Sequence, residues 1–252
     1  MVTRKSRREI EKMRVAGRIV AEVLALVEME LRPGVSTSHL DGIAERHIRS
    51  SGAVPSFKGY GHRSNPFPGS LCISIDDEVV HGIPGERAIR AGQIVSIDAG
   101  AIYDGWHGDG ARTFVVGEPT PEIRELVDTT RLAMMAGIAA AVPGASLGDI
   151  SGAIEDIAAP GGYGIVKQFV GHGIGTEMHQ EPQVPNYRTG YRGMKLETGI
   201  CLAIEPMLTL GSGDVEVRRD GWTVATADGS LAAHFEHTIA VTDQGPVILT
   251  SV

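Results

Sequence analysis

The chain has 252 residues, of which 42% are hydrophobic and 21% are charged, a balance that is ordinary for a soluble globular protein. Its formal net charge of −8 disfavours a protein that grips a nucleic-acid backbone over its whole surface. Cys72 and Cys201 form no Cys-x-x-Cys pair, which predicts a reducing, cytoplasmic setting and no zinc knuckle. No apolar run is long enough to span a bilayer, so no contact with a membrane is expected.

Two local basic patches remain in this acidic chain. They comprise Arg4, Lys5, Arg7 and Arg8 at the start of the sequence, and Arg188, Arg192 and Lys195 in a polar loop. Each patch is either a solvated face or a docking surface for an acidic partner such as ribosomal RNA. The ribosome is therefore one candidate partner of this protein.

The N-terminal segment has the pattern of a helix. Ser6 and Glu9 have the spacing of a capping box, and apolar residues then recur at helical intervals until the Pro-Gly pair at 33–34. This predicts one long amphipathic helix. A second helix is predicted over about 37–50, before the Ser-Gly pair at 51–52.

Short runs with the composition of β-strands follow the second helix, at residues 71–75, 92–100 and 111–117. Asp104 and Gly105 give a hairpin-turn signal between the last two runs. Asp98 and Asp109 lie on either side of this turn, so we expect them on adjacent antiparallel strands. Their carboxylates could then approach from neighbouring rungs.

The helical pattern restarts in the second half of the chain. One helix is predicted to begin at Pro121 and to end at the Pro-Gly pair 143–144, and another runs to the Pro-Gly pair 160–161. Residues 33–52 and 143–162 align without gaps and share Pro, Gly, Ser and Glu at matching places. The sequence therefore indicates an internal repeat.

The repeat predicts a single catalytic domain over 1–252, built from two pseudo-symmetric halves at about 10–120 and 121–252 that close on a shared site. His81 and His179 each begin a His-x-x-Pro element that follows the helices of its half. We expect these two histidines to face each other across a cleft. Chance similarity between Gly-rich turns is the alternative to a repeat.

Five residues able to bind a divalent metal are spread over the C-terminal three-fifths of the chain: Asp98, Asp109, His172, Glu205 and Glu236. Four carboxylates and one imidazole make an oxygen-rich set with room for two ions that share bridging carboxylates. The set predicts metal-assisted hydrolysis. Taken singly, each member has a structural alternative, such as a strand-end aspartate or a histidine in a Gly-rich loop.

The two glutamates give the stronger signals within this set. Glu205 closes the apolar run ICLAI, where a buried carboxylate is costly unless it pairs with a cation or a metal. Strand alternation places Glu236 on one face with Thr238 and Ala240. The Gly-Ala-Ser-Leu-Gly segment at 144–148 has the pattern of a nucleophile elbow, but it follows a helix and a proline instead of a strand, so no serine nucleophile is expected.

The ordered segments HGIP, SIDAG, DGWHGDGARTF, GHGIG, MHQEPQVPNY, IEPM and HFEHTIAVT together resemble the type I methionine aminopeptidases over essentially the whole chain. The resemblance implies the α+β pita-bread (creatinase/aminopeptidase-like) fold, in which two αβ halves enclose a dinuclear metal site for Co, Mn, Fe or Zn. It places the metal ligands on the same five residues. It also implies catalytic roles for His81, His179 and Glu205, with both histidines contacting the substrate. The absence of a zinc-finger extension indicates the short bacterial form.

The same resemblance implies a pocket for the methionine side chain, lined by Tyr60, Phe67, Cys72, Met178 and Trp222. The sequence departs from the family pattern at three places. Met178 stands where an aromatic residue is usual, the segment from Tyr60 to Cys72 is longer than expected, and His234 occupies a place often held by an amide.

The implied activity is removal of the N-terminal methionine from nascent polypeptides that have a small second residue, by a monomeric cytoplasmic enzyme. One alternative is an X-Pro aminopeptidase or prolidase-like peptidase of the same superfamily, although such enzymes usually carry an N-terminal domain. The other is a non-catalytic binding protein on the same fold, which would be expected to have lost ligands. The native metal does not follow from the ligand set, because sites of this composition accept several divalent ions.

Overall fold

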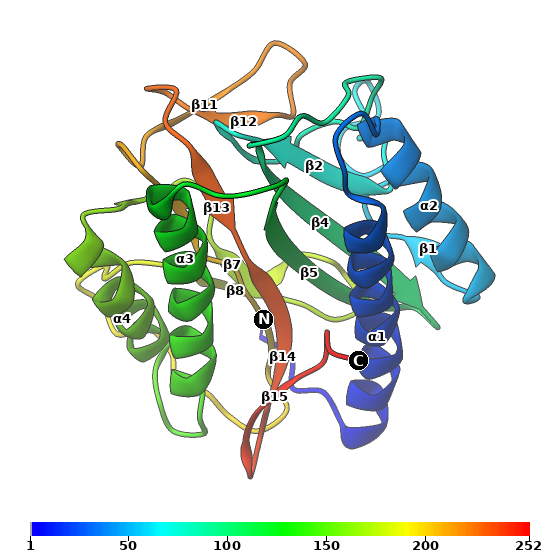
Figure 1. Cartoon of the computed structure of the whole chain (residues 1–252). Helices are drawn as coiled ribbons and strands as arrows, with labels where there is room; N and C mark the ends of the chain where they lie inside the picture. The colour runs from blue at the N-terminus through cyan, green and yellow to red at the C-terminus, as the bar shows by residue number, and fades with distance from the viewer. Residues whose placement is uncertain (1) are drawn as a thin grey trace.

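The computed structural model describes residues 2–252, which form a mixed α/β fold with a curved central sheet (Figure 1). The helices are α1 (Arg7–Glu30), α2 (Thr37–Ser50), α3 (Pro121–Ala140), α4 (Leu147–Ala158) and a single 3-10 turn, Ala159–Gly161. The pair α1 and α2 and the pair α3 and α4 lie on either side of β14 in Figure 1, over the two halves of the sheet. No helix within residues 2–252 is long and apolar enough to cross a membrane.

The first helix begins as predicted. The Ser6 hydroxyl accepts a hydrogen bond from the amide of Glu9, and the Glu9 carboxylate accepts one from the amide of Ser6 at 2.7 Å, which completes a capping box. The helix ends at Glu30, before the Pro-Gly pair, because Leu31 is already extended. Gly34 then turns the chain with φ of 90°, a conformation that favours glycine.

The strands are β1 (Val54–Pro55), β2 (Leu71–Ile75), β3 (Glu78–Val80), β4 (Ile94–Tyr103), β5 (Trp106–Val115), β6 (Gly164–Ile165), β7 (Gly171–Gly173), β8 (Gln180–Val184), β9 (Cys201–Ile204), β10 (Met207–Thr209), β11 (Val215–Val217), β12 (Val224–Thr226), β13 (Ala232–His234), β14 (Glu236–Thr242) and β15 (Gly245–Ile248). Nine of them form the main sheet, in the order β1-β4-β5-β14-β9-β7-β8, with β2 paired to β4 and β15 to β14. The sheet thus joins strands from both halves of the chain through the antiparallel pair of β5 and β14.

The hairpin of β4 and β5 has the predicted turn. Tyr103 pairs with Trp106, and the two residues between them, Asp104 and Gly105, have φ of 47° and 79°. Positive φ at both positions is the signature of a two-residue hairpin turn whose twist matches the strands. The strand after the turn begins at Trp106 and not at position 111, so the prediction started it too late.

The Gly-rich first half of β5 lacks the apolar alternation from which a strand is predicted. Gly108 is buried where α1 crosses the sheet, and a Cβ added there would lie 2.5 Å from the backbone nitrogen of Gly17. A Cβ on Gly17 would in turn collide with the backbone carbonyl of Leu249. Helix and sheet therefore approach through backbone, which only glycine permits at these two positions.

The two Pro-Gly segments of the predicted repeat have matching local structures. Gly34 and Gly144 have φ of 90° and 87°, and the serines that follow them, Ser36 and Ser146, precede α2 and α4. Each serine also forms an isolated β-bridge, to Ala88 in one half and to Lys195 in the other. The Asp149 carboxylate accepts hydrogen bonds from the amide and hydroxyl of Ser146, so this serine starts a helix, as expected for a segment without a nucleophile.

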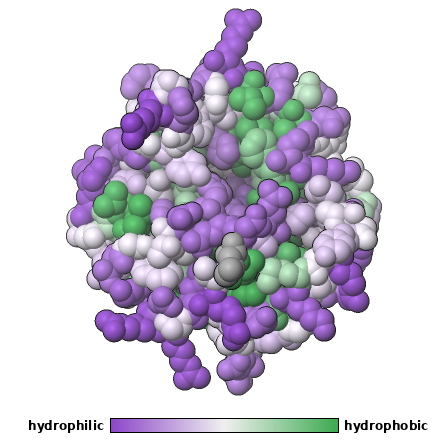
Figure 2. All heavy atoms as spheres, turned by 180° about the vertical axis from the view of Figure 1, so that it is seen from behind, coloured by the Kyte–Doolittle hydropathy of each residue, from purple (hydrophilic) through white to green (hydrophobic). Residues whose placement is uncertain are grey.

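Each helix pair covers its own hydrophobic core. Leu24 and Ile48 pack with Ile73 and Ile97 of β2 and β4 in the first half. In the second half, a separate cluster joins α3 and α4 to β9 and β14. Figure 2 shows the face opposite to that of Figure 1, where hydrophilic residues predominate and the hydrophobic ones form separate groups.

Candidate active site

One cavity brings together every residue assigned to the site from the sequence. Its walls comprise the expected metal-binding and catalytic residues Asp98, Asp109, His172, Glu205, Glu236, His81 and His179, the expected pocket residues Tyr60, Phe67, Cys72, Met178 and Trp222, and four others, Phe57, Val80, Phe169 and His234. The carboxylates gather at one end and the aromatic and sulfur-containing side chains at the other. No lysine or arginine lines this cavity within residues 2–252.

The two aspartates come from the central hairpin. Asp98 of β4 pairs with Ala111, and Asp109 of β5 pairs with Gly100, so the two side chains are two positions apart on neighbouring strands and share a face. Burial raises the pKa of Asp98 to about 7. Burial, followed by the charges of Glu236 and Asp98, raises the pKa of Asp109 well above its usual range. Two such carboxylates are costly to ionise without a cation.

The two glutamates reach the same face from the second half of the chain. Glu236 begins β14 and pairs with Ala111, the residue that also pairs with Asp98. Glu205 directly follows β9, whose Ile204 pairs with His237 of β14. Burial also raises the pKa of both glutamates well above the ordinary value, with neighbouring carboxylates adding to the shift.

His172 lies in a three-residue strand, β7, paired with both β8 and β9, and not in a Gly-rich loop as expected. The flanking glycines serve these neighbouring strands, because a Cβ on Gly171 would collide with the carbonyl of Ala203, and one on Gly173 with the carbonyl of Glu181. A strand of three residues is too short to show the alternation from which strands are predicted, so the pairing of these glycines could not be recognised in the sequence.

The hydrogen bonds of His172 fix which nitrogen is available to a ligand. Its Nδ1 lies 2.9 Å from the carbonyl oxygen of Gly173, and a carbonyl only accepts, so Nδ1 carries the proton. The lone pair is then on Nε2, 3.4 Å from Oε1 of Glu205. Burial lowers the pKa of His172 to about 3, so the ring is neutral at physiological pH. A lone pair facing a carboxylate oxygen requires a proton or a cation between them.

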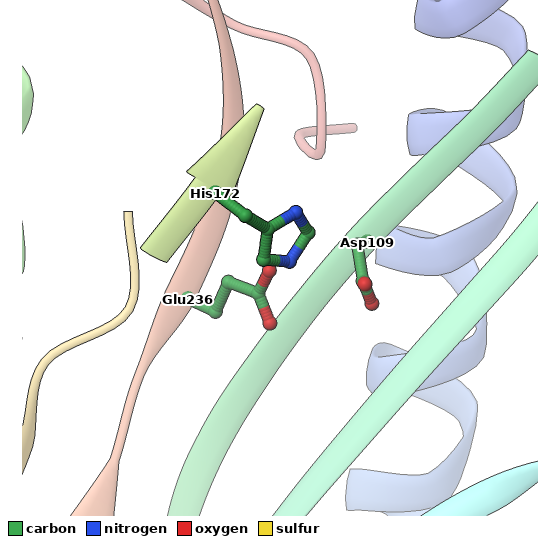
Figure 3. Close-up of side chains that lie close together, drawn as sticks. All are labelled: Asp109, His172 and Glu236. Atoms are coloured by element: carbon green, nitrogen blue, oxygen red, sulfur yellow. The ribbon is translucent and has the colours of Figure 1, made fainter. Parts of the chain in front are cut away.

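This donor set fits divalent metal ions. One ligand atom from each of Asp109, His172 and Glu236 lies within 4.8 Å of the others, and Figure 3 shows the three side chains converging from β5, β7 and β14. Carboxylate oxygens of Asp98, Asp109 and Glu236 are buried without a hydrogen-bond partner in the described chain. Buried anionic oxygens without donors are strongly unfavourable, and divalent cations bound by carboxylates and a neutral imidazole would satisfy them.

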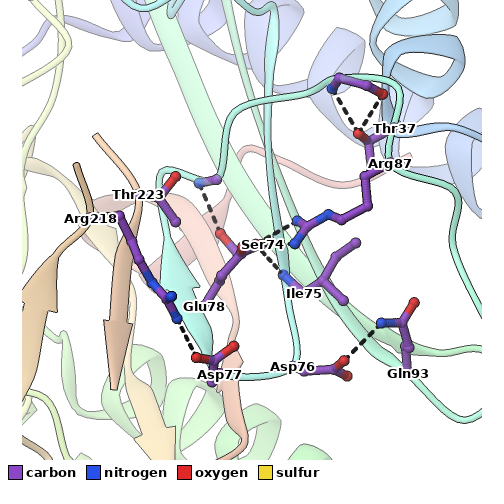
Figure 4. A network of polar contacts seen from close by, with 12 residues as sticks. Thr37, Ser74, Ile75, Asp76, Asp77, Glu78, Arg87, Gln93, Arg218 and Thr223 are labelled. Carbon is purple, nitrogen blue, oxygen red and sulfur yellow. Dashed lines mark hydrogen bonds and ion pairs between the residues drawn. The ribbon is translucent and has the colours of Figure 1, made fainter. Parts of the chain in front are cut away.

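His81 is held in a strained conformation at the edge of the cavity. Its φ is 60°, which is unfavourable for a residue with a side chain. The adjacent Gly82 is fixed on both sides, since its amide donates to the Ser74 hydroxyl at 3.1 Å and its carbonyl accepts from the amide of Ile73 at 2.8 Å. The polar network beside this turn is drawn in Figure 4.

In that network the Glu78 carboxylate accepts from the amide of Ile75 at 2.9 Å and pairs with the Arg87 guanidinium at 2.6 Å. These bonds brace the loop that carries His81. Burial, and then the charge of His179, lowers the pKa of His81 to about 4. Both histidines line the cavity, as expected for two groups that face one cleft.

The apolar end is built mainly from loops and turns. Phe57, Phe67, Cys72 and Met178 form a buried cluster against which Trp222 packs. The rings of Phe67 and Trp222 meet edge to face with centroids 5.3 Å apart. Cys72 of β2 pairs directly with Asp98 of β4, so this thiol marks the border between the two ends of the cavity.

The segment between Tyr60 and Cys72 contacts the opposite wall of the cavity. The amide nitrogen of the Asn65 side chain donates to the carbonyl of Asp220 at 3.0 Å, and the Trp222 indole donates to the carbonyl of Asn65 at 3.1 Å. Asn65 therefore ties the loop that carries Tyr60 and Phe67 to the turn that carries Trp222.

Three lining residues were missed in the sequence: Phe57, Val80 and Phe169. Phe57 follows β1, whose two-residue pairing with β4 is too short to recognise from a pattern. His234 was noted only as a departure near Glu236. It is 2% exposed and its Nε2 has no hydrogen-bond partner in residues 2–252, so it belongs to the wall of the cavity.

Comparisons with known proteins agree with this fold. Residues 11–243 match the model of metallopeptidase family M24, and the chain belongs to this family. It is 49% identical over 251 residues to the methionine aminopeptidase of Clostridium acetobutylicum, with 99% of each chain covered. The crystal structure of the methionine aminopeptidase of Thermotoga maritima matches with a TM-score of 0.96 and 41% identity over 100% of both chains.

The protein is therefore a metallopeptidase that uses divalent metal ions, and it has the pita-bread fold of its family. The prolidase of Pyrococcus horikoshii also matches, with a TM-score of 0.80 and 24% identity, over 99% of this chain and 63% of that one. This second likeness is one of fold alone.

Proposed function

We propose that this protein hydrolyses the N-terminal methionine from nascent polypeptides whose second residue is small. The observation that carries the proposal is the single cavity with a carboxylate end and an apolar, sulfur-containing end. The first end suits a free α-amine and a scissile carbonyl, and the second suits an unbranched thioether. Full-length similarity to methionine aminopeptidases supports the same activity.

We infer that Asp98, Asp109, His172, Glu205 and Glu236 hold two divalent ions, which can be Co, Mn, Fe or Zn. The support for this assignment comes from the buried carboxylate oxygens without hydrogen-bond partners, the free Nε2 lone pair of His172, and a cavity that no lysine or arginine of residues 2–252 lines. When bound, such ions acidify a water molecule and polarise the scissile carbonyl.

The remaining roles fall to side chains of this chain. Glu205 accepts a proton from the attacking water, since it lines the cavity directly after β9 with its Oε1 3.4 Å from Nε2 of His172. His179 donates a hydrogen bond to the carbonyl oxygen as negative charge develops there. His81, held rigidly by its braced turn, contacts the scissile nitrogen or the amide of the next residue.

The methionine side chain occupies the apolar end, in contact with Tyr60, Phe67, Cys72, Met178 and Trp222. Burial raises the pKa of the Cys72 thiol, so the sulfur is neutral and compatible with a thioether. The cleft walls exclude a bulky second residue.

Partners and location extend the same proposal. We infer a cytoplasmic monomer that acts on nascent chain ends and docks on the ribosome through basic residues. In the C-terminal patch, Arg188 and Arg192 pair with acidic residues of α4. Among the seven basic residues of the two patches, Arg7, Arg8 and Lys195 are exposed and form no ion pair within residues 2–252, and these three support docking.

We also propose that residues 1–252 act as one catalytic domain with halves at about 10–120 and 121–252. The matching Pro-Gly segments and the ligands contributed by both halves support this division.

The test compares cleavage of Met-Ala-Ser and Ala-Pro peptides, with and without added metal. We expect metal-dependent release of methionine from the first peptide only. Efficient cleavage of the Ala-Pro peptide would favour an X-Pro peptidase, and no cleavage of either would favour a binding protein. Metal analysis of the protein isolated from its own cell would identify the native ion.

A further inference from the structure

The ring of His179 is held by a single hydrogen bond. Its Nδ1 lies 2.7 Å from the hydroxyl of Tyr60, and the two rings are tilted by 52° with centroids 5.4 Å apart. No other hydrogen bond joins the His179 ring to residues 2–252. On its other side the ring meets that of His172, with centroids 4.3 Å apart. Nε2 is therefore the nitrogen left for a ligand in the cavity.

We propose that Tyr60 is a positioning residue that fixes the tautomer of His179, in addition to any contact it makes with the methionine side chain. In a neutral imidazole one nitrogen donates and the other accepts. If the Tyr60 hydroxyl donates to Nδ1, the proton of the ring lies on Nε2, which can then donate to a carbonyl oxygen. The opposite arrangement would leave Nε2 as an acceptor facing a carbonyl oxygen, which is repulsive. The inference rests on the proposed function, because it assigns this donor to the scissile carbonyl.

The loop that carries Tyr60 is built to hold the hydroxyl in place. Gly59 and Gly61 have φ of 87° and 92°, which turns the chain sharply on both sides of the tyrosine. The Tyr60 amide donates to the carbonyl of Phe57 at 2.9 Å, and the Tyr60 carbonyl accepts from the amide of Phe67 at 2.9 Å. A Cβ on Gly61 would lie 2.5 Å from the Trp222 ring, so the loop is pressed against the opposite wall.

The same short loop therefore supplies a wall of the apolar end and the hydroxyl that orients His179. A methionine side chain packed against Phe67 and Trp222 would hold the loop, and with it the Tyr60 hydroxyl, in this position. Binding at the apolar end and hydrogen bonding at the scissile carbonyl are thus connected through one residue.

The kinetic test removes only the hydroxyl. In Tyr60→Phe the aromatic wall remains, so we expect KM for Met-Ala-Ser to stay within about twofold while kcat falls about three- to tenfold, the size expected for one neutral hydrogen bond. Tyr191→Phe is the matched control, because Tyr191 is 79% exposed and lies outside this cavity. In a His179→Ala background, Tyr60→Phe should have no further effect on kcat. A raised KM with unchanged kcat would make Tyr60 a pocket wall only and overturn the proposal.

A spectroscopic test is independent of turnover. Nitrogen-15 NMR of histidine-labelled, metal-free protein at mildly alkaline pH reports which ring nitrogen carries the proton, and His179→Ala identifies the signal among the nine histidines. We expect Nδ1 of His179 to be unprotonated in the wild type and to gain proton occupancy in Tyr60→Phe. A protonated Nδ1 in the wild type, or identical spectra, would overturn the proposal. Failure of the proposed function is distinguishable, since the wild type would then release no methionine whatever its tautomer.

Discussion

The two ends of the cavity are built in different ways. The carboxylate end takes its side chains from or beside paired strands, with Asp98 and Asp109 on β4 and β5 and Glu236 on β14. The apolar end takes most of its side chains from loops and turns, including Phe67 and Trp222. Strand pairing fixes which residues lie opposite each other and which face their side chains share, whereas the conformation of a loop depends on individual contacts. Substitutions at the first end should therefore affect metal binding and kcat. Those at the second should affect KM, except for removal of the Tyr60 hydroxyl, which acts through His179.

Asp109→Asn should give the largest effect. A neutral amide lacks the charge needed to bridge two cations, so metal-dependent turnover should be lost and bound metal reduced. Folding should survive, because the substitution removes one member of a group of mutually repelling carboxylates. The measurements are peptide cleavage, metal content and thermal unfolding.

Asp104→Asn is the matched control, since this aspartate lies in the exposed turn of the same hairpin and pairs with Lys12 at the surface. It should keep full activity and metal content. Wild-type activity in Asp109→Asn would remove the dinuclear assignment.

His179→Ala should lower kcat by roughly a hundredfold, equivalent to ~3 kcal/mol, with a smaller change in KM. The reason is that its hydrogen bond strengthens only as charge develops on the carbonyl oxygen. Steady-state kinetics with Met-Ala-Ser would check this, with His39→Ala, on α2 and outside the cavity, as control. An unchanged kcat with weaker binding would assign His179 to substrate positioning alone.

Without metal, the free energy of unfolding should fall as pH rises. Carboxylates in ion pairs have the opposite effect, because their lowered pKa makes the free energy of unfolding rise with pH. The pKa of Asp98 is raised from 3.8 to about 7, and those of Asp109, Glu205 and Glu236 are also raised. The folded metal-free protein then holds protons that the unfolded chain has released. This stability is present below the unfolded pKa and is lost as pH rises through about 7.

We therefore expect metal-free protein to unfold at lower denaturant concentration near about pH 8 than near about pH 6, and metal to stabilise it more at the higher pH. Urea unfolding with a chelator or with Mn²⁺ at both pH values would measure this. Asp109→Asn should reduce the dependence. Metal-free stability that rises over this interval would contradict the proposed crowding of carboxylates.

The same contrast explains what could be predicted from the sequence. Residues on long paired elements, such as Asp98 and Asp109 with the Asp104 turn between them, follow from hairpin chemistry and alternation. The strand around His172 could not be recognised, because three residues carry no period and its pairing depends on distant β8 and β9. The start of β5 could not be predicted, because its glycines are required by the close approach of α1 and interrupt the apolar alternation of a strand.

The pocket required more than local pattern. The resemblance to a family placed Tyr60, Phe67 and Trp222 together, but the bridge through Asn65 depends on a loop that lacks secondary structure. Phe57 and Phe169 reach the cavity only through tertiary contacts. Metal-binding residues on paired strands can thus be predicted from a single sequence, whereas residues on loops that determine specificity are much harder to predict.

Trp222→Ala should raise KM for Met-Ala-Ser by about tenfold, because it removes an edge-to-face contact with Phe67 and the indole donor that ties Asn65 to this turn. Added metal should not restore binding, since the lesion lies at the apolar end. Trp222→Phe should lose less, as it keeps an aromatic ring. If kcat fell and KM stayed constant, the division of the cavity into two ends would be wrong.

The smallest effects are expected at Met178. Met178 is buried and unbranched, and its flexible thioether can adapt to substrates of slightly different length. We expect kcat/KM for norleucine-Ala-Ser and ethionine-Ala-Ser to lie within about threefold of that for Met-Ala-Ser, while Met178→Phe should selectively lower kcat/KM for the longer ethionine peptide.

A lysine peptide should be rejected, because burying an ammonium beside Phe67 and Trp222 costs several kcal/mol. The measurement is a series of X-Ala-Ser peptides with X as Met, norleucine, ethionine, Leu and Lys. Efficient cleavage of the Leu or Lys peptide would contradict methionine specificity and indicate a general aminopeptidase. The assignment of the carboxylate end to metal binding would not be affected by that result.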